Sequence, residues 1–151
     1  MKKQLTLLAV GFLTATMLTA CGQDPAITEF KYEIDDFCTS IATLDNSINN
    51  IDAQSDDATS QLLRYLNELE IEFQNFAELD FPKGFDYLEN LADEAGTYMT
   101  EAVKSYEAAF QEEYDAAMAE YAKENYSRAY KRVQIIITFL HGEEPEDVNV
   151  S

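Results

Sequence analysis

Apolar residues follow a helical repeat along most of the chain beyond residue 24, with gaps that alternate between four and three positions. This repeat places them on one face of a helix that packs in a bundle. The first row consists of Phe30, Ile34, Phe37, Ile41, Leu44, Ile48 and Ile51. The second row consists of Leu62, Leu66, Leu69, Phe73 and Phe76. Two helices are therefore predicted, and the first should begin at Asp24 and Pro25, a capping residue followed by a proline at the first helical position.

The second half of the chain shows the same repeat with little punctuation. A third row consists of Leu88, Leu91, Ala95, Tyr98 and Ala102. A fourth row consists of Ala119, Ala122, Tyr126, Ala129, Val133, Ile136 and Leu140. Pro82 and Gly84 separate the second row from the third, and Gly142 is suited to end the last helix. No glycine or proline lies between the last two rows, yet one helix of that length would not suit a compact domain, so we place a turn near residues 111–115.

Together the four rows predict an all-α fold, an antiparallel up-down four-helix bundle over residues 25–141. Short connections make consecutive helices antiparallel, and the spacing of the rows favours shallow crossing angles. The alternative is three long helices, with the last two fused into one. Residues 133–140 are uncharged and rich in isoleucine, a pattern that a strand could share. The chain offers no partner strand, so this segment is assigned to the last helix.

Residues 1–20 have the pattern of a secretory signal, which is removed from a mature protein. Lys2 and Lys3 form a basic start, and residues 5–18 form an apolar run that only threonine and glycine interrupt. A membrane-spanning helix needs about 20 apolar residues, and this run is shorter and has a polar flank. The segment is therefore interpreted as a signal peptide rather than a transmembrane helix.

The four residues that close this segment, Leu18-Thr19-Ala20-Cys21, resemble the lipobox of bacterial lipoproteins. The resemblance implies cleavage between Ala20 and Cys21, a diacylglyceryl group on the Cys21 thiol and an acyl chain such as palmitate on the new amino terminus. Two or more acyl chains anchor a protein stably, and residues 21–24 would be a short tether. The implied location is the cell membrane or the outer membrane, with the domain extracytoplasmic. Beyond these covalent lipids no cofactor is expected.

Acidic residues dominate the charge of the chain, with 29 Asp and Glu against 10 Lys and Arg and a formal net charge of −19. Removal of residues 1–20 takes away two lysines and no acid, so the mature chain is two charges more negative. Such a field repels nucleic-acid phosphates and anionic lipid headgroups. We therefore expect no nucleic-acid partner, and we expect any partner protein in the envelope to be basic. Residues 142–151 are predicted to form an acidic mobile tail.

Sequence patterns for catalysis and metal binding are absent. The single histidine, His141, cannot supply the two Glu-x-x-His pairs of a di-iron bundle. After lipidation Cys38 is the one cysteine left, which is too few for a zinc site. Cys38 is interpreted as a small buried residue, and an intermolecular disulfide is the alternative. We predict no catalytic residue, no metal site and no enzymatic activity.

Tyrosines in the second half of the chain are candidate binding residues. They form two pairs that share a helical face, Tyr114 with Tyr121 and Tyr126 with Tyr130. One interpretation is a groove that stacks on sugars, peptide or cell-wall polymer. The other is a position at the edge of the core, with the hydroxyl groups in water.

Three basic residues, Arg128, Lys131 and Arg132, gather within five positions of this acidic chain. They could form a local anion site, or they could pair with acids of neighbouring helices and complement the helix dipole. The sequence as a whole favours a membrane-anchored lipoprotein whose acidic helical domain is a non-catalytic protein-interaction module. The alternative is a small-ligand or cell-wall-component binding protein with a Tyr-lined groove between helices.

Overall fold

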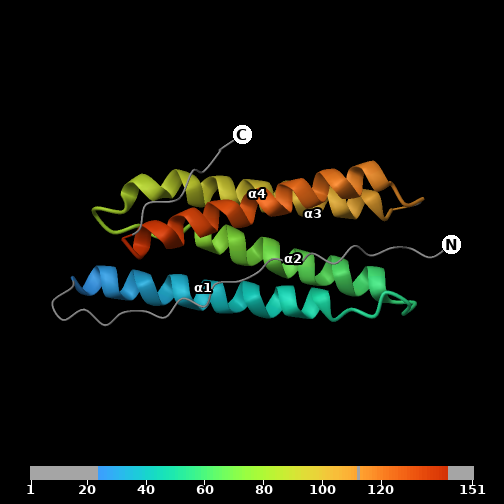
Figure 1. Cartoon of the computed structure of the whole chain (residues 1–151), viewed down its shortest axis with the longest axis horizontal. Coiled ribbons are helices and arrows are strands. Elements are labelled where there is room, and N and C mark those ends of the chain that lie inside the picture. Colours follow the sequence, from blue (N-terminus) through green and yellow to red (C-terminus); the bar gives the residue numbers. More distant parts are fainter. Residues whose placement is uncertain (1–23, 112, 143–151) are drawn as a thin grey trace.

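The computed structural model describes residues 24–111 and 113–142, which form four helices (Figure 1). The elements are α1 (Pro25–Asn49), α2 (Ala58–Ala77), the short 3₁₀ helix η1 (Asp86–Leu88), α3 (Glu89–Ala109) and α4 (Ala116–Leu140). Consecutive helices run in opposite directions, and the described residues contain no strand. The predicted up-down four-helix bundle is confirmed. The alternative with a fused last helix is wrong, because α3 ends at Ala109 and α4 begins only at Ala116.

The four helices pack unequally. The α3–α4 pair is the closest, and α2 packs against α3 on one side and α1 on the other. In Figure 1, α2 runs between α1, at the bottom of the view, and the α3–α4 pair above it. α1 and α4 approach each other more loosely than any of these pairs. Any contact that holds α1 against α4 therefore has few neighbouring contacts to support it.

Aspartate caps explain where two of the helices begin. The Asp24 carboxylate accepts a hydrogen bond from the Ala26 amide at 3.0 Å, as the sequence predicts for the start of α1. The Asp115 carboxylate accepts two, from the amides of Ala117 at 2.9 Å and Met118 at 3.0 Å. This double cap starts α4 and lets the chain turn without a glycine or proline. It is the physical reason why the last two rows belong to separate helices.

Aromatic rings join the helices at the centre of the core. Phe37 of α1 stacks on Phe76 of α2, with ring centroids 4.2 Å apart, and meets Phe73 edge-on at 5.3 Å. Phe73 also contacts Tyr130 of α4 at 5.4 Å. Most residues of the four predicted rows are buried. Five residues of the rows are only partly buried: Leu44, Ile51, Leu91, Tyr98 and Ala119. In α3 the residues Met99, Val103 and Tyr106, which lie outside the predicted row, are buried as well.

Gly96 marks the point where α3 comes closest to α2. A Cβ atom at this position would lie 3.3 Å from the Cβ of Ala77 and 3.4 Å from the carbonyl oxygen of Phe73. The second of these neighbours is backbone, which cannot move without shifting α2. A larger side chain at position 96 would therefore push the two helices apart.

Gly96→Val is expected to lower the free energy of unfolding by about 1–3 kcal/mol through overpacking. This cost exceeds the gain in helix propensity, which is about 0.4 kcal/mol for valine over glycine. Urea denaturation followed by circular dichroism measures the change. The control is Thr97→Val at the next, exposed position, where the effect should stay within about 0.5 kcal/mol. Equal effects at the two positions would contradict the close approach of the helices.

Candidate interaction surface

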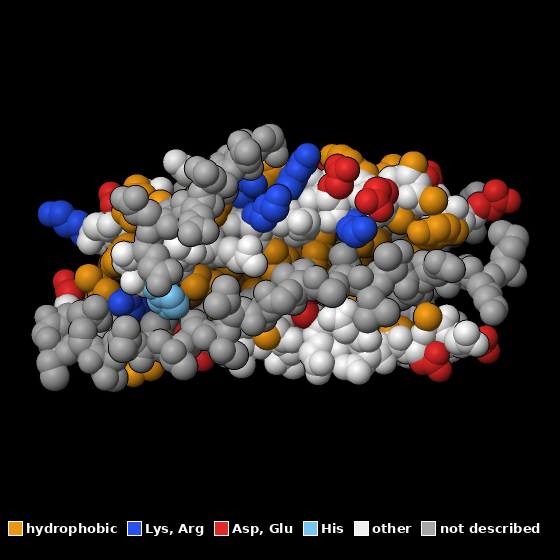
Figure 2. Space-filling view, in the orientation of Figure 1, with side chains coloured by type: hydrophobic (Ala, Val, Ile, Leu, Met, Phe, Trp, Pro, Cys, Tyr) orange, Lys and Arg blue, Asp and Glu red, His pale blue; other side chains and the backbone are white. Residues whose placement is uncertain are grey.

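Aromatic and basic side chains line the outer edge of the α3–α4 pair. We call this set the outer row; it consists of Tyr87, Tyr98, Tyr121, Arg128, Arg132 and Phe139. Its four α4 members are spaced by seven, four and seven residues, which places them on one face of the helix. Contacts across the pair fix the arrangement, since the rings of Tyr87 and Phe139 meet edge-on at 5.7 Å. Figure 2 shows basic side chains over this part of the molecule, with hydrophobic and acidic ones near the α3–α4 turn.

Arg132 is the most firmly held member of the outer row. Its side chain is only 7% exposed, and its Nε donates a hydrogen bond to Glu94 Oε2 of α3 at 2.9 Å. The guanidinium also lies over the Tyr98 ring, 4.9 Å from the centroid. The carboxylate and the aromatic face offset the hydration that the guanidinium loses on burial, which explains how it can be buried here. These contacts fix the position of Arg132 before any partner arrives.

The three predicted basic residues do not form one patch. Arg128 lies beside Arg132, with its guanidinium 5.8 Å from the centroid of the same Tyr98 ring. Lys131 is exposed, and the helical repeat points it away from Tyr98. The second interpretation of these three residues is pairing with an acid of a neighbouring helix. It holds for Arg132, which pairs with Glu94 of α3.

Tyr114 and Tyr121 lie on the surface near the α3–α4 turn, each 47% exposed. Tyr114 precedes the capping residue of α4 and packs against Phe110, with ring centroids 5.3 Å apart. Met118, one turn before Tyr121 on the same side of the helix, is 36% exposed. These side chains extend the apolar part of the outer row to the end of the bundle, where α1 also ends.

Tyr126 and Tyr130 are buried between the helices instead. Their rings stack with centroids 4.8 Å apart, and the two hydroxyl oxygens lie 3.3 Å apart, so that Tyr126 Oη can accept a hydrogen bond from Tyr130. The Tyr126 hydroxyl also donates a hydrogen bond to Asp45 Oδ1 of α1. Burial raises the pKa of both tyrosines well above the ordinary value, so both stay neutral. The structure thus brings Tyr126 and Tyr130 together and leaves Tyr114 and Tyr121 outside.

Three residues in these contacts do not stand out in the sequence as binding residues: Asp45, Glu94 and Tyr98. The sequence does indicate that Asp45 is buried, because it lies four residues after Ile41 and seven after Cys38, on the buried side of α1. A carboxylate in that register predicts a buried polar contact. Nothing in the sequence distinguishes Glu94 from the other acidic residues, since exposed acids occur throughout the chain.

Cys38 is buried on this same side of α1, and its thiol is free. Burial, with a smaller contribution from Asp35, raises the pKa of the thiol to about 12. The thiol is therefore protonated and unreactive while α1 is packed. This agrees with the interpretation of Cys38 as a small buried residue.

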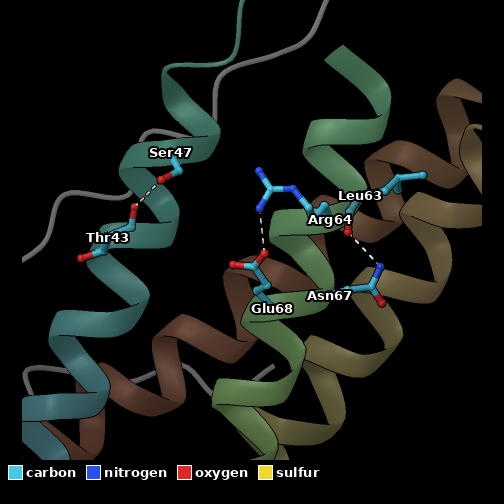
Figure 3. Close-up of polar contacts among 6 residues, drawn as sticks. All are labelled: Thr43, Ser47, Leu63, Arg64, Asn67 and Glu68. Carbon is cyan, nitrogen blue, oxygen red and sulfur yellow. Dashed lines mark hydrogen bonds and ion pairs between the residues drawn. The ribbon is translucent and has the colours of Figure 1, made fainter. Parts of the chain in front are cut away.

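By contrast, polar side chains on the outer sides of α1 and α2 bond within their own helices (Figure 3). The Ser47 hydroxyl donates to the carbonyl oxygen of Thr43 at 2.9 Å. Arg64 pairs with Glu68 one turn along α2, also at 2.9 Å. An exposed pair of this kind contributes about 0.3–0.5 kcal/mol. Two side chains of α2 also reach α3: Asn67 donates to Glu107 at 3.3 Å, and Gln74 donates to Thr100 at 3.2 Å.

Residues 24–111 and 113–142 contain no group of three or more His, Cys, Asp or Glu side chains placed to hold a metal ion. None of the helices in those ranges is long and apolar enough to cross a membrane. The predicted cleavage and lipidation residues, Ala20 and Cys21, lie outside the described residues, as does the predicted tail beyond Gly142. No protein-family model, no curated protein and no solved structure matches this chain.

Proposed function

We propose that the protein is a lipid-anchored, non-catalytic interaction module of the bacterial cell envelope that binds a basic partner protein through its outer row. The anchor rests on the resemblance of Leu18-Thr19-Ala20-Cys21 to a lipobox. The binding role rests on one observation, the outer row of Tyr, Arg and Phe side chains with the exposed Met118 beside it.

The composition of the outer row supports binding to a protein. Tyrosine, arginine, methionine and phenylalanine are enriched in interfaces, and tyrosine and arginine supply many of the residues that dominate binding energy. Tyr121 and Met118 leave much of their apolar surface in water, which a partner could cover. The buried Arg132 holds Glu94 and the Tyr98 ring in place, so little conformational entropy is lost when a partner packs against these two side chains.

Charge supports a basic partner. The chain carries a formal net charge of −19, and a field of this sign speeds the encounter with a positively charged surface. Next to the outer row, Glu94 is about half exposed, and Asp115 and Glu120 are exposed near Tyr121. The surface therefore offers aromatic contacts within an acidic rim.

Photo-crosslinking in cells tests this proposal. A photoreactive phenylalanine analogue in place of Tyr121 is expected to give a discrete adduct with one envelope protein that has a basic surface. The matched control is the same replacement at Tyr32, a tyrosine of α1 that is 67% exposed and lies away from the outer row. With the partner in hand, Tyr121→Ala should weaken binding by about tenfold or more.

Two results would count against the proposal. One is the same set of adducts at positions 32 and 121, which would indicate random collision at any exposed site. The other is a specific adduct with an acidic protein whose binding does not weaken at high salt, because a complex steered by opposite charges must be sensitive to salt.

A further inference from the structure

A polar cluster joins α1 to α4, which pack together less closely than the consecutive helices of the bundle. Asp45 of α1 accepts a hydrogen bond from Tyr126 of α4, and Tyr126 stacks on Tyr130. The consecutive helix pairs are held by more extensive packing. The state of Asp45 therefore has a large influence on whether α1 stays against α4.

Two buried oxygen atoms in this cluster have no hydrogen-bond partner among the described residues. They are Asp45 Oδ2 and Asn49 Oδ1. The two residues are four apart on α1, so their side chains lie one above the other on the same face. Both atoms are acceptors, and a buried acceptor without a donor costs about 1–3 kcal/mol. Each of the two oxygen atoms therefore lacks a donor.

We propose that Asp45 is a proton-controlled latch: in its neutral form Oδ2 carries a proton that is donated to Asn49 Oδ1, and its ionisation loosens α1 from α4. A single proton would satisfy both oxygens. Asp45 Oδ1 would continue to accept the hydrogen bond from Tyr126. Ionisation would leave a buried negative charge with one unbonded oxygen, and separation of α1 from α4 would let water reach it.

Among the residues that the structure describes, the groups that face Asp45 provide no positive charge to hold it ionised. α4 provides the hydroxyls of Tyr126 and Tyr130, and α3 provides Tyr106, which acts on Tyr126. α2 provides the Phe73 ring, which contacts Tyr130. Burial raises the pKa of Asp45, and the hydrogen bonds from the two tyrosines offset only part of this rise.

The direction of the pH effect follows from the raised pKa. An acid whose pKa is higher in the folded than in the unfolded state stabilises the fold at low pH. That stabilisation is lost as the pH rises through the folded pKa. Asp35 and His141 also interact along the α1–α4 contact, ten residues from Asp45 on α1. A variant at position 45 is needed to separate the effect of Asp45 from theirs.

Asp45→Asn tests the latch, because asparagine copies the neutral acid with a permanent donor. Cys38 reports opening, since it is buried two turns from Asp45 on the same face of α1. Alkylation of Cys38, read by mass spectrometry of its own peptide, should be about tenfold faster in the wild type than in Asp45→Asn at about pH 8. The ratio of the two rates should fall towards one as the pH is lowered, because Asp45 then becomes neutral in the wild type. Asp36→Asn, an exposed carboxylate on the same helix, should behave like the wild type at both pH values.

A pH titration of the wild type, followed by the carbon-13 shift of the Asp45 carboxyl, gives a direct measurement that does not depend on the folding of a variant. The expected midpoint lies above the ordinary aspartate pKa of about 3.9. A midpoint at or below that value would overturn the proposal. So would faster alkylation of Cys38 in Asp45→Asn than in the wild type, because the carboxylate would then be the form that closes the contact.

Discussion

Phe73→Ala is expected to lower the free energy of unfolding by about 3–5 kcal/mol. The ring is completely buried, and it contacts Phe37 of α1 and Tyr130 of α4. Its removal leaves a cavity where three helices meet, and the close approach at Gly96 limits how far α2 and α3 can move to fill it. A typical domain is stable by about 5–15 kcal/mol, so this one change removes a large part of the total.

Ile71→Ala is the matched control for Phe73→Ala. Ile71 is an apolar residue on the same helix, but it is 57% exposed. Its truncation should change the stability by no more than about 0.5 kcal/mol. Urea denaturation at fixed pH, followed by helical circular dichroism, measures both variants. A small effect at Phe73, similar to that at Ile71, would show that the ring is not part of a packed core.

The apolar rows predicted the helices because burial in a bundle imposes a period on the sequence. The rows of α1 and α2 are almost entirely buried as expected, and Pro25 and Gly142 lie at the ends they predict. The turn between α3 and α4 was harder to place, since its signal is a single capping residue, Asp115. Aspartate is common in this chain, so one more does not mark a turn by itself.

Contacts between helices could not be predicted in the same way. A helical repeat gives the face of each helix but not how far one helix is shifted along the next. Tyr98 fits the third apolar row, yet it lies at the outer edge of the α3–α4 pair. Two arginine guanidinium groups of α4 lie over its ring. The Asp45–Tyr126 hydrogen bond joins residues 81 positions apart. Such partners become visible only when the helices are placed together.

The outer row and the latch lie on different sides of α4, which has consequences for an anchored domain. α4 presents Tyr121, Arg128 and Arg132 outward beside α3, while Tyr126 and Tyr130 face α1. α1 begins at Pro25, four residues after the predicted lipidation site. If Cys21 is lipidated as we propose, a change in the packing of α1 would alter the orientation of the bundle at the membrane without disturbing the outer row.

Cys21→Ser is expected to move the protein from the membrane fraction to the soluble fraction and to abolish its labelling by a fatty-acid analogue. The serine hydroxyl is a much weaker nucleophile than a thiolate and cannot replace it as the acceptor of the diacylglyceryl group. Each buried methylene of an acyl chain contributes about 0.8 kcal/mol, so loss of all chains should make the release nearly complete. No helix within the described ranges could serve as a second anchor by spanning the membrane.

The matched control for Cys21→Ser is Cys38→Ser, which changes the only other cysteine of the chain. Cys38 is buried in the bundle, so its replacement should lower stability by about 1–3 kcal/mol by burying a hydroxyl, while labelling and membrane attachment persist. Labelling that survives in Cys21→Ser would mean that the lipobox interpretation is wrong. If labelling is lost in Cys38→Ser while the protein folds and Cys21 is intact, the lipid is attached to Cys38 and not to Cys21. Because the two variants exchange the same atoms, any difference between them comes from position alone: one thiol is at the predicted new amino terminus, and the other is in the core.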